Sequence, residues 1–472
     1  MKKSLLTNTL VTGMILYAFL GTAEAALPLS LADSIRMAVK NNETVRASLA
    51  DREAARWQLS AARREAGPTV AWESRAYRIG GKDYDNSRQA HRLAPERYPD
   101  PYKNTFGNTV GIRFPLFTGG RIEETIKASR YQLNAADMAL ENTKQSMRFA
   151  VTDAYYNILQ RKNLVTVAES AFRMSSEQLS LIETQYEEGS LAKSDVLHMQ
   201  VEMANYRQSL VSAKGALQIA EASLLSLLGL PENTEIETTD SLTYEPYPLS
   251  LEECLAYAEA NRPDAAAADY AIKQADARVR AARSGDRPGI VAVANKTVAD
   301  NKAFRDDRNE NWEAGIHLSW NVFDNNVTHA NVRTAKASAE RARAEAEGTD
   351  KAVRLETRSA YIKMKAAEDN IRSAEAAVKQ AEENLTIAQV RYEEGVDILL
   401  SLTDAQEKLV KARTNYYSAL YEYNLGKAEL EKAMGVPVDI AVPRYVAEQK
   451  NGKSPGKALQ AAALTENETA RK

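Results

Sequence analysis

The sequence predicts a mainly α-helical protein with a small β part, built from two tandem copies of one unit. Three observations lead to this prediction. Motifs recur at fixed displacements, two segments (residues 121–188 and 327–394) could form helices too long for a compact globule, and a few short segments alternate apolar and polar residues. We expect the helices to form long antiparallel hairpins and the alternating segments to form four strands.

The internal repeat sets the domain organisation. Residues 27–31 recur as residues 247–251, 220 positions later, with the Pro-Leu-Ser-Leu pattern retained. The Tyr-Glu-Glu-Gly motif at 186–189 recurs at 392–395, 206 positions later, so the first copy holds 14 additional residues. A duplicated unit of this size predicts two structural repeats, which we place at 26–240 and 241–443.

The two ends of the chain are expected to lie outside the repeats. Two lysines near the start precede an apolar stretch at 10–20 and an Ala-Glu-Ala pattern at 23–25, which is typical of a cleaved signal peptide at 1–25. No later run approaches the roughly 18 apolar residues of a membrane-spanning helix. The segment 444–472 has little apolar content and is predicted to be disordered.

Each repeat opens with a helix start signal. Ser30 precedes Asp33 by three positions, and Ser250 precedes Glu253 in the same way, which is the capping-box pattern. Helices should begin at both sites. The first can run without glycine or proline from Leu29 to Ala66.

Four strands follow from alternation of period two. Residues 312–323 place Trp312, Ile316, Leu318, Trp320 and Val322 on one face, and residues 106–114 repeat the pattern. Partner strands are expected at about 69–77 and 290–298, joined by a long loop at 80–104 and a shorter one at 299–311.

These strands allow two interpretations. The first is a pair of hairpins in a soluble domain. The second is an outer-membrane sheet, which suits strands of about ten residues with aromatic ends in an exported chain. Four strands cannot close a barrel, and open edges are not tolerated in lipid, so further copies of the chain would have to complete it.

The long helices complete each repeat. A helix over residues 121–188 would extend about 100 Å at about 1.5 Å per residue. Its counterpart at 327–394 is interrupted only by Gly348. Helices of this length need lateral neighbours along their whole length, and a coiled-coil wall provides them.

Composition argues against several classes of function. The formal charge is only -3 and no basic block appears, so nucleic acid is not an expected partner. Four scattered histidines have no metal-ligand spacing, and no catalytic motif is present, so we expect no enzyme activity, metal or cofactor. The single cysteine, Cys254, cannot form an intrachain disulfide and is expected to be a small buried apolar residue.

Together these residues resemble the TolC-type outer membrane efflux protein family over residues 27–437. The resemblance rests on the tandem repeat, the Pro-Leu-Phe-Thr-Gly-Gly strand exit at 115–120, the Tyr-Glu-Glu-Gly turns and the Leu-Gly-x-Pro and Met-Gly-x-Pro closures. It implies a homotrimer with a twelve-stranded transmembrane β-barrel in the outer membrane and a long helical barrel in the periplasm. The loops at 80–104 and 299–311 would then face outside the cell.

The resemblance also implies a function and partners. It predicts the passive exit duct of a tripartite efflux or type I secretion system, working with a periplasmic adaptor (membrane fusion) protein and an inner-membrane transporter. The alternative is a periplasmic coiled-coil structural or adaptor protein that does not span the membrane. That alternative explains the helices but not the alternating strands.

The Tyr-Glu-Glu-Gly turns are expected at the periplasmic tip. Gly189 and Gly395 stand where a left-handed residue ends a helix. In the family these turns touch the adaptor, which implies an adaptor-contact tip formed by Gly189, Ser190, Leu191, Gly395 and Val396, with Asp397 beside them.

A second set of residues resembles the family's periplasmic gate. Asp404 matches an acid that rings the narrow aperture, while Ser401 stands where a second acid would be. Asp195 and Tyr392 match residues of a polar latch, but Asp397 occupies the position of its basic member, which departs from the family pattern. Asp195 also suits a cap or first-turn acid of the returning helix.

Overall fold

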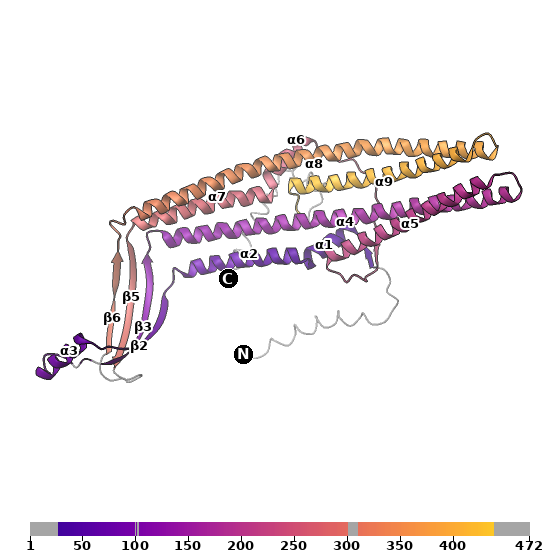
Figure 1. Ribbon diagram of the computed structural model, residues 1–472. Helices are drawn as coiled ribbons and strands as arrows, with labels where there is room; N and C mark the ends of the chain where they lie inside the picture. Colours follow the sequence, from indigo (N-terminus) through magenta and orange to yellow (C-terminus); the bar gives the residue numbers. More distant parts are fainter. Residues whose placement is uncertain (1–26, 100, 102, 301–309, 439–472) are drawn as a thin grey trace, which may run out of the picture. The chain divides into compact units, whose positions relative to one another are not determined.

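The computed structural model describes residues 27–99, 101, 103–300 and 310–438 (Figure 1). The signal peptide predicted at 1–25 and the tail predicted at 444–472 lie outside these residues. The described part is mainly helical and contains two sheets. Its elements, in chain order, are β1 (Leu27–Leu29), α1 (Leu31–Asn41), α2 (Glu43–Arg64), β2 (Thr69–Arg78), α3 (Lys82–Leu93), β3 (Asn104–Phe117), α4 (Arg121–Glu187), α5 (Lys193–Leu228), β4 (Ile236–Thr238), α6 (Leu251–Asn261), α7 (Pro263–Ala282), the 3-10 helix η1 (Arg283–Asp286), β5 (Gly289–Asp300), β6 (Glu310–Ser319), α8 (Val327–Glu393) and α9 (Leu399–Met434).

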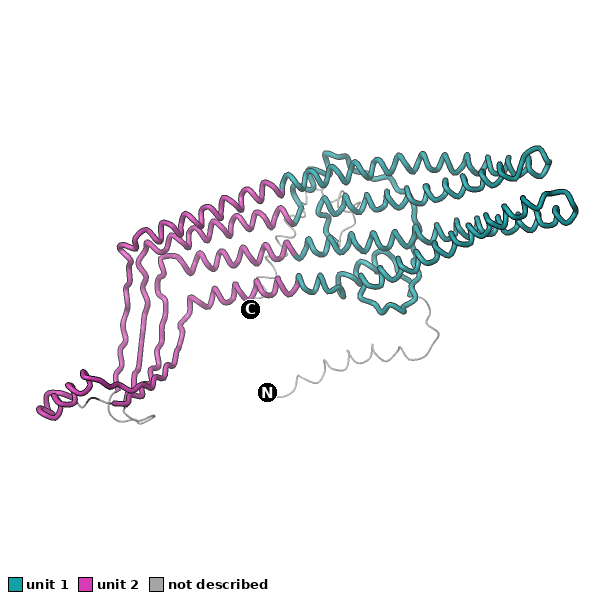
Figure 2. Tube along the Cα trace, viewed as in Figure 1, with its two compact units in different colours: residues 1–48, 140–263, 350–472 teal, residues 49–139, 264–349 magenta. Residues whose placement is uncertain are grey.

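The chain clusters into two compact units, each of which combines segments of both predicted repeats (Figure 2). The first unit comprises residues 1–48, 140–263 and 350–472, and the second comprises 49–139 and 264–349. The long helices α4 and α8 contribute residues to both units. They confirm the helices predicted at 121–188 and 327–394, each ending one residue earlier than expected.

The second unit contains a four-stranded sheet in the order β2-β3-β5-β6, with every neighbouring pair antiparallel (Figure 1). Three of its strands confirm the predicted segments. The strand predicted at 312–323 is shorter and ends at Ser319, which pairs with Gly289. The pairing of β5 with β6 stops at Gly289 and Ser319. Pro288, the residue before Gly289, has no N–H that could extend the pairing.

The loop predicted at 80–104 contains a helix, α3. Its twelve residues include neither glycine nor proline. Asp83 and Asp85 lie in the first turn and His91 and Arg92 in the last, an order that complements the helix dipole. No residue of α3 is buried, so the helix forms from local sequence preference and not from packing.

The helix predicted from Leu29 to Ala66 is wrong in two respects, because Leu29 belongs to β1 and the helix is broken at Asn42. Asn42 has extended backbone angles, and its Oδ1 accepts the N–H of Thr44 at 2.8 Å, as a cap of α2 does. Its Nδ2 donates to the carbonyl of Leu227 at the end of α5, at 3.2 Å. The Asn42 side chain therefore provides hydrogen bonds to the start of α2 and to the end of α5. Helix ends need such partners because their terminal backbone groups lack intrahelical ones.

Both predicted capping positions are confirmed as helix starts. Ser30 accepts the backbone N–H of Asp33, and Ser250 accepts that of Glu253. Only Glu253 also reaches back to the N–H of Ser250, at 2.9 Å, to complete a reciprocal capping box. In the first copy the aspartate hydrogen-bonds to the serine hydroxyl instead.

Two matching turns join strands to long helices in the second unit. Gly119 and Gly120 precede α4 with φ of 65° and 92°, and Asn325 and Asn326 precede α8 with φ of 54° and 65°. Glycine and asparagine are the residues that best tolerate this left-handed region. At Gly119 a Cβ would also lie 2.9 Å from the Cβ of Arg287, so this position has no room for a side chain.

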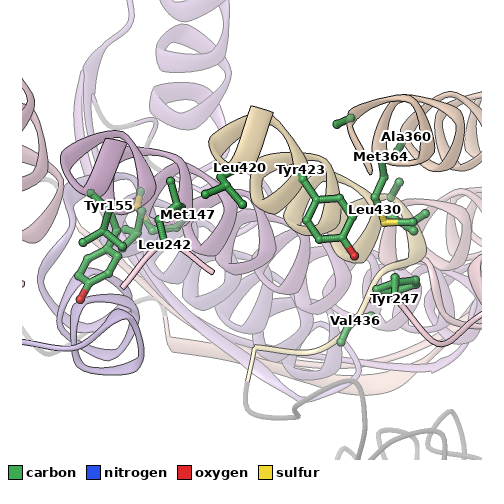
Figure 3. Packing of buried hydrophobic residues seen from close by; sticks show 14 of the residues in the cluster. Met147, Tyr155, Leu242, Tyr247, Ala360, Met364, Leu420, Tyr423, Leu430 and Val436 are labelled. Carbon is green, nitrogen blue, oxygen red and sulfur yellow. The ribbon is translucent and has the colours of Figure 1, made fainter. Parts of the chain in front are cut away.

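The first unit is held together by one large apolar core (Figure 3). Tyr155 of α4 and Tyr423 of α9 are among its largest fully buried side chains, and Cys254 of α6 is also fully buried, as predicted. The Tyr155 hydroxyl donates to Asp240 at 2.7 Å and lies 2.9 Å from the carbonyl oxygen of Leu29. These contacts anchor the short parallel β1–β4 sheet to the helices, because the hydroxyl would otherwise be buried without partners.

Over the residues that the structure describes, no helix combines the length and the apolar character needed to cross a membrane.

Candidate functional site at the tips of the helical hairpins

The turn between α4 and α5 is closed by Gly189. Its φ is 78°, and its N–H donates to the carbonyl of Tyr186 at 2.9 Å. The N–H of Ser190 reaches back to the carbonyl of Gln185, also at 2.9 Å, which completes a Schellman motif. The predicted left-handed cap is confirmed. Gly189 and Ser190 are exposed, whereas Leu191 is half-buried.

The turn between α8 and α9 has the same geometry. Gly395 has φ of 70° and donates to the carbonyl of Tyr392 at 3.0 Å, and the N–H of Val396 reaches the carbonyl of Arg391 at 2.9 Å. Gly395 and Val396 are exposed. The two tips therefore have the same backbone conformation and differ in their side chains.

An apolar cluster, which we call the tip cluster, joins the two hairpins. Leu399, the first residue of α9, is the buried member that the α8/α9 hairpin contributes to this cluster, and it is 8% exposed. Leu399 belongs to the same buried cluster as four residues of the other hairpin, which are Leu179, Ile182, Val196 and Met199. Leu191 and Tyr392 pack against its edge. Burial of these side chains holds the tips of α4/α5 and α8/α9 together.

Tyr392 lies between the tip cluster and a second small cluster formed by Ala388, Leu402 and Ala405. Its hydroxyl is enclosed and has no hydrogen-bond partner among the described residues. Burial and then the nearby charge of Asp195 raise the pKa of Tyr392. Asp195 thus lies near enough to Tyr392 for its charge to act on the phenol, without a hydrogen bond between them.

Asp195 lies in the first turn of α5, whose N-cap is Ala192. It is therefore a first-turn acid and not the cap residue, a position where the helix dipole favours its negative charge.

Asp397 is held within its own turn. Its carboxylate pairs with Arg391 at 3.3 Å and accepts the N–H of Ile398 at 2.9 Å. The pKa of Asp397 is lowered, first by a hydrogen bond from the Ser401 hydroxyl and then by the Ile398 N–H and the charge of Arg391. Ser401 therefore supports the acid at 397. Arg391 therefore pairs with the acid at 397, the position where the resemblance implied a basic residue.

Asp404 is exposed on α9 and pairs with Lys408 on the next turn of the same helix at 2.6 Å. An exposed pair of this kind is weak, so the carboxylate remains accessible to ions in solution. Asp404 lies three residues after Ser401 on α9, and among the described residues its ion-pair partner is Lys408, not a residue of the Asp397 turn.

Two exposed residues of the second tip were not predicted from the sequence. Ile398 is 64% exposed and Leu400 is 60% exposed, next to the exposed Val396. The corresponding residues of the first tip, 206 positions earlier, are Ala192 and Ser194. Comparison of the two copies position by position would have found this difference, because the pattern within one copy gives no reason to single these residues out.

Metal-ligating side chains do not form a cluster among the described residues of the tips. Over the described part of the chain, no group of three or more His, Cys, Asp or Glu side chains could hold a metal ion. The geometry is that of two glycine-closed turns whose helices meet in an apolar cluster.

The family model for outer membrane efflux proteins matches residues 34–230 and 255–436, which is most of the chain and both copies of the predicted repeat. This protein belongs to the outer membrane efflux protein family. The family assignment made from the sequence motifs is confirmed, and so is an outer-membrane location.

Two relatives match most of this chain at low identity. It is similar to the outer membrane efflux protein BepC of Brucella suis biovar 1, with 23% identity over 88% of this chain and 87% of BepC. It is also similar to the alkaline protease secretion protein AprF of Pseudomonas aeruginosa, with 22% identity over 92% of this chain and 90% of AprF. Among solved structures, the outer membrane protein VceC of Vibrio cholerae has the same fold, with a TM-score of 0.74, 18% identity and coverage of 86% of this chain and 96% of VceC.

Proposed function

We propose that this outer membrane efflux protein is the passive exit duct of a tripartite efflux or type I secretion system, and that it works as a homotrimer with a twelve-stranded barrel. The observation that carries the proposal is a sheet of four antiparallel strands with one exposed apolar face and two unpaired edges. A passive duct needs no catalytic group and no cofactor.

The two edges of the sheet suit each other. β2 follows α2 and β6 leads into α8, and three successive antiparallel pairings make these two edge strands run in opposite directions. An edge β6 can therefore pair antiparallel with β2 of a second copy, which continues the alternation found inside the sheet. Three copies give twelve strands and leave no open edge, as lipid requires.

The apolar face suits contact with lipid. The register places Val70, Trp72, Val110, Ile112 and Phe114 on the same face as Trp312, Ile316 and Leu318. All of them are exposed in the single chain, and Trp312 is 79% exposed. A soluble sheet would bury such a face against another element. This exposure favours a membrane sheet over a periplasmic coiled-coil structural or adaptor protein.

The partners follow from the relatives and the tips. BepC is named as an outer membrane efflux protein and AprF as an alkaline protease secretion protein, and a passive duct in the outer membrane alone supplies no energy for export. We therefore assign the tip residues Gly189, Ser190, Leu191, Gly395 and Val396 to contact with a periplasmic adaptor, which connects the duct to an inner-membrane transporter. Exposed Ile398 and Leu400 extend this surface.

The gate is proposed for the same end of the hairpins. Asp404 would face the aperture, where threefold symmetry brings three carboxylates together and attracts cations. Asp195, Tyr392, Asp397 and Ser401 would form the surrounding wall. Position 397 holds an aspartate that pairs with Arg391. The proposed gate therefore does not use a basic residue at 397.

The domain organisation is proposed as a tandem duplication, with repeats at 26–240 and 241–443. Its support is the equal length of corresponding helices, because α4 and α8 each have 67 residues and α5 and α9 each have 36.

Cell fractionation tests the proposed function directly. We expect the protein in the outer-membrane fraction as a trimer that dissociates only on heating in detergent, and we expect it to conduct ions in a planar lipid bilayer. A monomer recovered from the soluble periplasmic fraction would overturn the proposal.

A further inference from the structure

The four-stranded sheet has a second face whose charges are arranged in an ordered way. The register places residues of opposite parity to Trp312 on this polar face, which carries four charged side chains among the described residues, namely Glu73, Arg75, Arg113 and Glu313. In the barrel proposed above, the polar face lines the water-filled lumen.

Two of the four charges neutralise each other. Arg75 and Glu73 lie two residues apart on β2 and form an ion pair at 2.9 Å. Next to them, the hydroxyls of Thr109 and Thr297 hydrogen-bond across β3 and β5 at 3.0 Å. This part of the face is polar without net charge.

The other two charges have no counter-ion. Within the described sheet, neither Arg113 on β3 nor Glu313 on β6 forms an ion pair. They lie on neighbouring levels of the ladder, since Arg113 pairs with Val293 and Glu313 pairs with Asn295. The strand β5 separates them.

Glu313 is positioned by its neighbours. The Nδ2 of Asn295 donates to Oε1 of Glu313 at 2.7 Å, and the Asn295 amide lies over Gly111 on the other side. A Cβ at position 111 would come within 2.6 Å of Oδ1 of Asn295 and displace the amide. The glycine therefore provides the space in which Asn295 orients the carboxylate.

We propose that Arg113 and Glu313 determine the charge selectivity of the barrel lumen, by forming a ring in which three guanidinium groups and three carboxylates alternate. The inference rests on the proposed trimeric barrel. The ring would act on small permeant cations and anions. Charged exported solutes would feel the same electrostatic interaction.

The size of such a barrel makes the effect measurable. Twelve strands spaced about 4.8 Å apart and tilted by about 40° enclose a wall radius of about 12 Å. Screening acts over about 10 Å at 0.1 M salt, and the side chains themselves point inward, so wall charges reach ions on the axis. The alternating ring is neutral as a whole, and removal of either charge leaves a ring of one sign.

Two substitutions test the ring by opposite outcomes. In planar bilayers under a potassium chloride gradient, E313Q leaves three arginines and should shift the cation-to-anion permeability ratio towards anions by about twofold or more. R113Q leaves three carboxylates and should shift the ratio towards cations by a similar factor. The control is K296Q, because Lys296 lies on the apolar face, where it pairs with Glu310. Conducting channels whose permeability ratio is the same in E313Q, R113Q and the unsubstituted protein would overturn the ring.

Single-cysteine variants separate failure of the ring from failure of the barrel. The only native cysteine, Cys254, is fully buried, so the background reactivity is low. A charged, membrane-impermeant thiol reagent should modify Glu313→Cys and leave Ala314→Cys, on the apolar face, unmodified in lipid. The reverse pattern would overturn the assignment of faces and the ring with it. Equal modification of both positions would refute the membrane barrel itself.

Discussion

The joint between the two hairpin tips depends on one leucine, and this gives a sharp prediction. Leu399→Ala removes the buried side chain that α9 contributes to the tip cluster, which is 8% exposed and belongs to one cluster with Leu179, Ile182, Val196 and Met199. The neighbouring Leu400 is 60% exposed and is a matched control of the same residue type.

The magnitude follows from burial. Truncation of a buried leucine to alanine costs about 2–5 kcal/mol, and the value depends on how far the site can collapse. The tip cluster is small and lies at the end of the hairpins, so partial collapse is expected, and we place the cost at about 2–3 kcal/mol. Leu400→Ala removes a side chain that is mostly in water already and should cost less than about 0.5 kcal/mol.

Amide hydrogen exchange is the assay, because the loss is local. In Leu399→Ala, amides in the first turns of α5 and α9 should exchange about 30- to 150-fold faster, which is the ratio that 2–3 kcal/mol produces. Amides around Tyr155 and Tyr423, in the core of the first unit, should keep their protection. Equal exchange at the tips of the Leu399→Ala and Leu400→Ala proteins would refute the view that the tip cluster joins the hairpins.

Three further predictions concern the aperture, the core and a helix end. Asp404→Ala should weaken block of single-channel current by divalent cations, and an unchanged block would remove Asp404 from the aperture. Burial raises the pKa of Tyr423 to about 12, so its contribution to stability is present below the ordinary tyrosine pKa of about 10 and is lost as pH rises towards 12. The Tyr423→Phe protein loses the hydrogen bond to the Glu245 carbonyl and should be less stable at neutral pH. Its free energy of unfolding, measured by circular dichroism, should also fall less between about pH 10 and about pH 12 than that of the unsubstituted protein. Gly435→Ala should lower the melting temperature, because Gly435 has φ of 75° and a Cβ there would lie 3.0 Å from the Cα of Arg262, whereas Gly348→Ala, in the open middle of α8, should raise stability by up to about 1 kcal/mol.

Local sequence signals located most of the helices and strands. Gly189 and Gly395 were predicted as left-handed helix ends because a residue without a Cβ is needed there, and both have positive φ. Ser30 and Ser250 were predicted as caps from a hydroxyl three residues before a carboxylate, and both accept the expected N–H. The alternation of period two located β6, because only one face of a strand is apolar here.

Two of the errors share one cause, which is that contacts between distant residues leave no local pattern. Asn42 breaks a segment of high helical character because its side chain serves Leu227, far along the chain. The strand at β6 ends at Ser319 because its partner strand begins after a proline. The helix α3 was missed for another reason, since the glycines and prolines on either side of it suggested a loop throughout.

The candidate site divides in the same way. The sequence by itself determined the positions of the two tips, the family and the acids near the turns, because caps, repeats and motifs are local or periodic. Only the tertiary structure decided that Leu399 joins the hairpins, that Asp397 pairs with Arg391, and that Arg113 and Glu313 share a face without a counter-ion. Packing, ion pairing and strand register depend on which residues meet in space, and one sequence read alone does not specify those meetings.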